Sequence, residues 1–157
     1  MFRMFLILVL SLFIVIGCST KYTEKETGNI EEANQFKTPP QLTLTVEEDS
    51  FTVAQGGYSW SYENIDGTTV FVEADSMPPG EIVSDKNPIE VDEDTEITLD
   101  FEMEPTDYKV KIWDANHNVL AVYDKINLSE YKGNVIYEVF ANWEQGSSSY
   151  AFLLYIK

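Results

Sequence analysis

Cysteine and histidine, which carry out much covalent and metal chemistry, are scarce in this chain of 157 residues. It contains a single cysteine, Cys18, and a single histidine, His117. One cysteine cannot form a disulfide within the chain, so the fold depends on packing. A zinc site draws its ligands from several cysteines and histidines, which this sequence does not supply. A catalytic triad is also disfavoured, because His117 lies in a predicted turn between two asparagines, where we expect an exposed side chain.

Basic residues are few as well. There are 10 lysines and arginines against 27 acidic residues, and the formal net charge is −17. Nucleic-acid binding depends on basic side chains that neutralise phosphates, so this composition excludes a nucleic-acid partner. Such a negative charge attracts cations or basic partners, or it keeps a tethered domain soluble and away from anionic lipids.

The long apolar run of this sequence lies at its start. Between Met4 and Ile16 the only polar residue is Ser11, and Arg3 precedes the run. A membrane-spanning helix needs about 20 apolar residues, so this stretch is too short to cross a bilayer comfortably. A positive charge, a short apolar region and a small residue before a cleavage site are typical of a secretory signal. We therefore expect residues 1–17 to be a signal peptide.

The end of this signal, Val15-Ile16-Gly17-Cys18, resembles the lipobox of bacterial lipoproteins. The resemblance implies that the Cys18 sulfur receives a diacylglycerol and that cleavage makes Cys18 the first mature residue. It also implies a chain anchored to the cell membrane and facing the outside of the cytoplasm, with no cofactor besides this covalent lipid. Two acyl chains give stable anchoring, whereas one holds only marginally. The alternative is an uncleaved signal anchor, or a cleaved signal in which the cysteine is incidental.

Residues 18–40 are expected to form a flexible tether. They are rich in lysine, glutamate, threonine and asparagine, and they show no apolar period. Such a segment cannot bury enough apolar surface to order itself. As a coil it would reach roughly 25 Å, enough to hold a small domain clear of the lipid headgroups. A stiff Pro39-Pro40 step ends it.

From residue 41 onward, apolar residues recur at every second position, which is typical of strands with one buried face. Asp66-Gly67 between two such runs indicates a hairpin of type I′, whose two central residues both need positive φ. A second hairpin is expected at the end of the chain, with a Glu144-Gln145-Gly146 turn. The alternating runs are residues 42–46, 51–53, 58–62, 69–74, 97–103, 108–112, 119–123, 135–143 and 150–156.

These eight or nine short strands predict an all-β fold, and we expect residues 41–157 to form a single antiparallel β-sandwich. The proline-rich residues 77–88 are expected to cross an edge or an end of the sheets. Tyr137-x-Val139-x-Ala141-x-Trp143 before a tight turn resembles the last hairpin of an immunoglobulin-like or fibronectin-type domain. That resemblance implies that Tyr137 is a corner tyrosine.

A second resemblance lies earlier in the domain. Residues 57–60 read Gly-Tyr-Ser-Trp, and Ala74-Asp75 and Pro78-Pro79 follow them. This order resembles small uncharacterised lipoproteins of Gram-positive bacteria. It implies relatives of the chain and brings no activity with it.

A group of acidic residues is a candidate calcium site. Asp92, Asp94 and Glu96, with Glu93 between them, lie just before a predicted strand. Carboxylate oxygens are ligands for calcium, but the spacing lacks the glycine-turned loop of an EF-hand. A solvated entry to the strand is the alternative interpretation.

The aromatic residues give a second candidate. Trp60 and Trp143 fall on predicted inner faces, where large aromatic side chains usually belong to the core. Alternation places Trp113 on the outer face instead, beside Lys109 and Lys111. We therefore predict these three residues as contacts for a sugar or a peptide.

Together these patterns predict a lipid-anchored, extracytoplasmic binding module without catalysis of its own. Its partner is expected to be an envelope protein or a wall polymer. One alternative is a cation-responsive regulatory or sensor subunit. Another is a hydrolase of the cell wall that uses two carboxylates, which would have to lie about 5 to 9 Å apart in a cleft.

Overall fold

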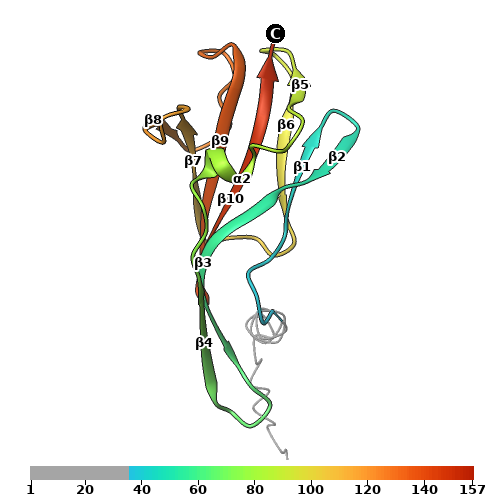
Figure 1. Ribbon diagram of the computed structural model, residues 1–157. Helices are drawn as coiled ribbons and strands as arrows, with labels where there is room; N and C mark the ends of the chain where they lie inside the picture. Colours follow the sequence, from blue (N-terminus) through green and yellow to red (C-terminus); the bar gives the residue numbers. More distant parts are fainter. Residues whose placement is uncertain (1–35) are drawn as a thin grey trace, which may run out of the picture.

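The computed structural model describes residues 36–157, so the signal peptide and Cys18 lie outside the described residues. Two sheets pack together as a sandwich, which confirms the predicted all-β fold (Figure 1). The elements are β1 Leu42–Val46, β2 Asp49–Thr52, β3 Ala54–Glu63, β4 Thr69–Ala74, α2 Pro79–Ile82, β5 Ile89–Val91, β6 Ile97–Phe101, β7 Asp107–Trp113, β8 Val119–Tyr123, β9 Gly133–Trp143 and β10 Gly146–Ile156.

The two sheets differ in size. The smaller has three strands in the order β2-β1-β6, and the larger has seven, in the order β4-β3-β10-β9-β7-β8 with β5 added beside β10. Every pairing is antiparallel except that of β5 with β10. The chain passes from the small sheet to the large one at Val53, which is buried between the end of β2 and the start of β3.

The core consists of side chains from alternate strand positions, as the period of two predicts. Leu42, Leu44 and Val46 line the buried face of β1. Trp60 and Trp143 are both buried, with ring centroids 5.6 Å apart in an edge-to-face arrangement, which is a favourable geometry for aromatic pairs. The buried faces of β9 and β10 add Val135, Tyr137, Val139, Ala141, Tyr150, Phe152, Leu154 and Ile156.

The β9–β10 hairpin confirms the second predicted hairpin. Its strands pair over their whole length, and Glu144 and Gln145 form the turn between them. The next residue must be glycine, because Gly146 has a φ of +150° and a Cβ there would lie 2.0 Å from the carbonyl oxygen of Ser59. A side chain at this position would push β3 away from β10.

Tyr137 ties the β9–β10 hairpin to the loop that precedes it. Its hydroxyl donates a hydrogen bond of 2.7 Å to the backbone carbonyl of Asn127. A corner tyrosine makes the same kind of contact to the backbone a few residues upstream. Burial raises the pKa of the Tyr137 hydroxyl above its ordinary value, so the hydroxyl keeps the proton that it donates.

The β3–β4 hairpin is also present, but its turn differs from the predicted one. Asn64 and Thr68 close a wider loop, in which the backbone N–H of Asn64 donates to the carbonyl of Thr68 at 2.8 Å. Only Gly67 has a positive φ there, at +79°, so the prediction of a type I′ turn is wrong. The Asp66 carboxylate accepts hydrogen bonds from the backbone and the hydroxyl of Thr68 instead.

The prediction that residues 77–88 cross an edge or an end of the sheets is wrong. The connection from β4 to β5 crosses the outer face of the large sheet, where the single helical turn α2 packs on β3, β9 and β10. Gly56 permits this approach, because a Cβ there would lie 2.4 Å from Ser149 Oγ and 3.4 Å from Ile82 Cδ1. The connection then enters β5, a three-residue strand directly after Pro88 that the alternation did not reveal.

The end of the expected tether is packed onto the domain. Pro39 and Pro40 are fully buried, and Phe36 packs against the core. The indole N–H of Trp60 donates to the carbonyl of Phe36 at 3.0 Å, and the hydroxyl of Tyr150 donates to the carbonyl of Pro40. Among residues 36–157, the ordered body therefore begins before the predicted boundary at residue 41. No helix in this part of the chain is long and apolar enough to cross a membrane.

Candidate functional site

Strand β7 divides its side chains between the core and the outer face of the large sheet. Val110 and Ile112 are fully buried. Lys109, Lys111 and Trp113 alternate with them and are more exposed. The three predicted contact residues therefore lie along one outward row, but the structure gives them different neighbours.

The centre of the outer face is Glu138 of β9. It stands directly opposite Lys111 in the strand register. Its Oε2 accepts a hydrogen bond of 3.1 Å from Trp113 Nε1 and lies 3.2 Å from Lys111 Nζ. The Glu138 side chain is only 10% exposed, although it belongs to the face that points away from the core. A carboxylate with so little water around it needs such partners, because burying an unpaired charge costs several kcal/mol.

Phe140 completes this group of side chains. The Lys111 ammonium lies 5.0 Å from the centroid of the Phe140 ring, within the range of a cation–π interaction. Lys111 is thereby held between a carboxylate and an aromatic face. We refer to Lys111, Trp113, Glu138 and Phe140 as the outer-face cluster.

Lys109 does not belong to the outer-face cluster. Its ammonium pairs with Asp124, which follows β8. The hydrogen bond between them is the main cause that raises the pKa of Lys109 and lowers the pKa of Asp124. Of the three predicted contacts, the structure thus brings two together and turns the third toward another partner.

A hollow of about 460 Å³ opens beside the cluster on the large sheet. Its lining combines charged, aromatic and hydroxyl groups and includes residues that follow β4. Such a mixture offers hydrogen-bond donors and acceptors around a small apolar surface. It can bind a polar, hydroxyl-rich ligand without any covalent step. The lining residues are Gly57, Tyr58, Ser59, Glu73, Ala74, Asp75, Ser76, Lys111, Glu138, Phe140, Ser147 and Ser149.

The candidate calcium site does not assemble. Among residues 36–157, no group of three or more acidic, histidine or cysteine side chains is placed to hold a metal ion. Asp92, Asp94 and Glu96 are exposed around a turn in which the backbone N–H of Asp92 donates to Thr95 Oγ1 at 2.9 Å. Glu93 between them is exposed as well, which fits a solvated entry to the strand.

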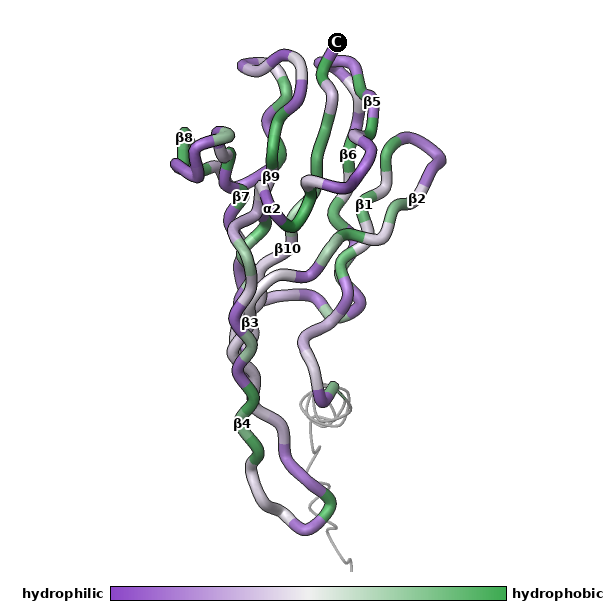
Figure 2. Tube along the Cα trace, viewed as in Figure 1, coloured by the Kyte–Doolittle hydropathy of each residue, from purple (hydrophilic) through white to green (hydrophobic). Residues whose placement is uncertain are grey.

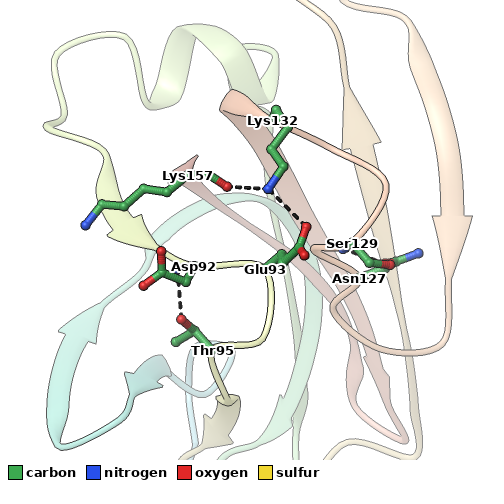
Figure 3. Close-up of polar contacts among 7 residues, drawn as sticks. All are labelled: Asp92, Glu93, Thr95, Asn127, Ser129, Lys132 and Lys157. Atoms are coloured by element: carbon green, nitrogen blue, oxygen red, sulfur yellow. Dashed lines mark hydrogen bonds and ion pairs between the residues drawn. The ribbon is translucent and has the colours of Figure 1, made fainter.

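Glu93 has a structural partner instead of a metal. Figure 3 shows its carboxylate paired with Lys132, which also donates to the backbone carbonyl of Lys157. Lys132 therefore links the turn before β6, the loop before β9 and the end of β10. A cleft of about 640 Å³ lies beside this junction, between residues 93–97 and 123–129.

His117 occupies the turn before β8, as predicted. It has a positive φ of +64°, and its Nε2 lies 3.8 Å from Glu81 Oε1 on the connection that crosses the sheet. His117 is not among the residues that line the hollow. It therefore lies apart from the outer-face cluster.

Glu138 and Phe140 were missed by sequence reasoning. Both occupy outward positions of β9, and Glu138 is the only ionisable residue between Val135 and Trp143 apart from the buried Tyr137. That lone charge was the available signal. Its partner on β7 depends on the strand register, which one sequence does not give.

No protein-family model, curated protein or solved structure matches the chain.

Proposed function

We propose that this chain is a lipid-anchored, extracytoplasmic binding module of the bacterial cell envelope. The Val15-Ile16-Gly17-Cys18 sequence supports the anchor, which would be a diacylglycerol on Cys18. Removal of residues 1–17 would take away Arg3 and no acidic residue, so the formal charge would change from −17 to −18. A tethered domain with this charge is repelled by anionic headgroups and stays exposed to the envelope.

The outer-face cluster is the observation that carries the binding role. Glu138 and Lys111 are kept on the outer face of the sheet although both lose much of their hydration there. A buried ion pair adds little to stability compared with apolar packing, so stability alone does not account for this pair. The serine hydroxyls of β3 and β10 line the same hollow. These groups favour a hydroxyl-rich wall polymer over an apolar protein surface.

The same contacts support a role without catalysis. Glu138 Oε2 is held by both Trp113 and Lys111, so a ligand would meet the second oxygen, Oε1, or the Lys111 ammonium. Histidine is the usual general base, and His117 lies outside the hollow. We expect the hollow to hold a ligand in place without reacting with it.

The placement of the chain ends fits an anchored module. Figure 1 shows the described chain entering at the end from which the β3–β4 hairpin projects, whereas the C-terminus lies at the opposite end. The outer face of the large sheet runs between the two ends. A ligand on this face would not have to pass between the domain and the membrane.

Crosslinking in intact cells tests the proposal. Lys111→Met and Glu138→Gln should each lower the yield of wall-polymer adducts at least about tenfold, because hydrogen bonds to charged groups contribute about 1.5 to 3 kcal/mol. Lys109→Met is the matched control, since it removes a lysine from the same row of β7 outside the hollow. Equal yields from all three variants, with folding verified by circular dichroism, would refute the binding role of this face.

A further inference from the structure

A second hollow, of about 330 Å³, lies between β10 and the connection that leads to β5. We call it the β10 pocket. It is separate from the outer-face cluster, since the two hollows share no lining residue. Its lining is Phe51, Thr52, Val53, Ala54, Val83, Lys86, Asn87, Ile89, Ala151, Phe152 and Leu153.

The β10 pocket exists because β10 changes its neighbour halfway along. Its first half pairs with β3, and that pairing ends at Ala151 opposite Ala54. Its last part pairs with β5, beginning at Leu154 opposite Ile89. No residue of β3 or β5 is paired with the stretch between these two points, so an opening is built into the topology and does not depend on one side-chain conformation.

The walls of the β10 pocket are mostly apolar. Val53, Val83 and Phe152 are 4%, 2% and 5% exposed, so they are held in place by the body of the domain. Phe51 and Ile89 are half-buried at its rim. A concave surface of this kind removes water from an aliphatic chain, which contributes about 0.8 kcal/mol for each buried CH₂ group.

The charge of the β10 pocket is opposite to that of the chain. The protein has 27 acidic residues and 10 basic ones, yet among the described residues the pocket lining contains no acid and one lysine, Lys86. Lys86 Nζ lies 3.4 Å from Asp85 Oδ1, and both side chains are largely exposed. Exposed pairs of this kind contribute little, so Lys86 can turn to an anionic head group at the rim.

We propose that the β10 pocket binds the hydrocarbon chain of a free fatty carboxylate, with its head group at Lys86. The pocket volume lies at the lower end of the usual range for ligand sites, about 300 to 1,000 Å³, which suits one chain of medium length and not a two-chain lipid. This binding does not depend on the anchor at Cys18 or on the outer-face cluster.

Photolabelling of the full chain in membrane vesicles tests the proposal. The probe is decanoate with a photoreactive diazirine in its chain, and mass spectrometry identifies the labelled residues. Labelling should saturate, fall within residues 51–54, 83–89 and 151–153, and be displaced by unlabelled decanoate. Lys86→Glu should weaken it about fivefold, since it replaces an attraction at an exposed site by a repulsion. Ala54→Leu should weaken it by filling the pocket.

Two controls separate this result from a general effect on the protein. Lys109→Glu makes the same charge change outside the pocket, and Ala115→Leu makes the same enlargement in the exposed turn before β8; both should label as the natural chain does. A decylamine probe of equal length should label poorly. Labelling that does not saturate, that is equal with the amine probe, or that is unchanged in Lys86→Glu overturns the proposal.

Discussion

The protein contains two long hairpins that a sequence pattern describes in the same way but that differ in their surroundings. The β9–β10 hairpin lies in the middle of the large sheet, and one of its faces is buried along both strands. The β3–β4 hairpin is attached only at its base, and residues 61–71 project from the body as a two-stranded ribbon (Figure 1). Figure 2 shows hydrophobic residues in this ribbon as well.

This difference shows that the stability a strand contributes depends on the elements packed against it, and not on its alternating pattern alone. In the ribbon, Ile65 and Phe71 are exposed, at 107% and 78% of their reference area. In β9 and β10 the corresponding apolar positions pack against the small sheet. A two-stranded hairpin alone is marginally stable in water, so the ribbon depends on the body that holds its base.

The largest difference in stability is expected when one large aromatic side chain is removed from each hairpin in turn. Trp143→Ala should lower the free energy of unfolding by about 3 to 5 kcal/mol, because it empties a packed site against Trp60. Phe71→Ala should change it by less than about 0.5 kcal/mol, since the ring is exposed. Urea denaturation gives both values. Similar losses in the two variants would mean that the ribbon is part of the core.

A smaller contrast is expected at the turn glycines. Gly146→Ala should cost about 2 to 3 kcal/mol, because its Cβ would collide with the backbone of Ser59. Gly67→Ala should cost about 1 kcal/mol, since only the positive φ opposes it and its nearest contact is 3.8 Å away. Thermal unfolding of the two variants ranks them. The reverse order would contradict the close approach of β3 to β10.

Removing a tyrosine hydroxyl should also cost the two hairpins different amounts of stability, and this difference should be smaller still. Tyr137→Phe removes the hydrogen bond to Asn127 and should cost about 1 kcal/mol. Tyr62→Phe in the ribbon keeps the ring that lies under the Lys37 ammonium and should cost close to nothing. Chemical denaturation at neutral pH measures both, and an equal cost would argue against a specific role of Tyr137.

The smallest effect on stability is expected from lowering the pH. Hydrogen bonds from Thr68 lower the pKa of Asp66 in the ribbon turn, and hydrogen bonds from Asn118 lower the pKa of Asp114 in the turn before β8. Their stabilisation is therefore present above the unfolded pKa of about 3.9 and is lost as the pH falls through the lower folded pKa. Asp114→Asn should flatten this part of the stability curve. A curve that keeps its slope below pH 4 in this variant would contradict the assignment.

Much of the fold could be predicted from the sequence, because burial on one face imposes a period of two that is legible in a single chain. The buried row of β1, the core tryptophans Trp60 and Trp143, and the β9–β10 hairpin were all predicted in this way. The short strand β5 was not, since three residues after a proline carry no period. The type of turn at Asp66-Gly67 was also wrong, because a wider loop places only Gly67 in the left-handed region.

The candidate site was predictable only in part. Alternation put Lys109, Lys111 and Trp113 in one row, and the structure keeps that row. It could not show that Glu138 stands opposite Lys111 or that Lys109 pairs with Asp124, because both follow from pairings between distant segments. The candidate calcium site shows the opposite case. Its acidic residues are close in sequence, but they lie exposed around a turn and do not form a group that could hold a metal ion.

Mass spectrometry of the amino terminus, on protein extracted from cell membranes, is the measurement that decides whether this domain is anchored. The proposed function predicts a first peptide that begins at Cys18 and carries a diacylglycerol on its sulfur, and it predicts that Cys18→Ser stays unlipidated. Soluble protein with an intact Met1 and an unmodified Cys18 would contradict it.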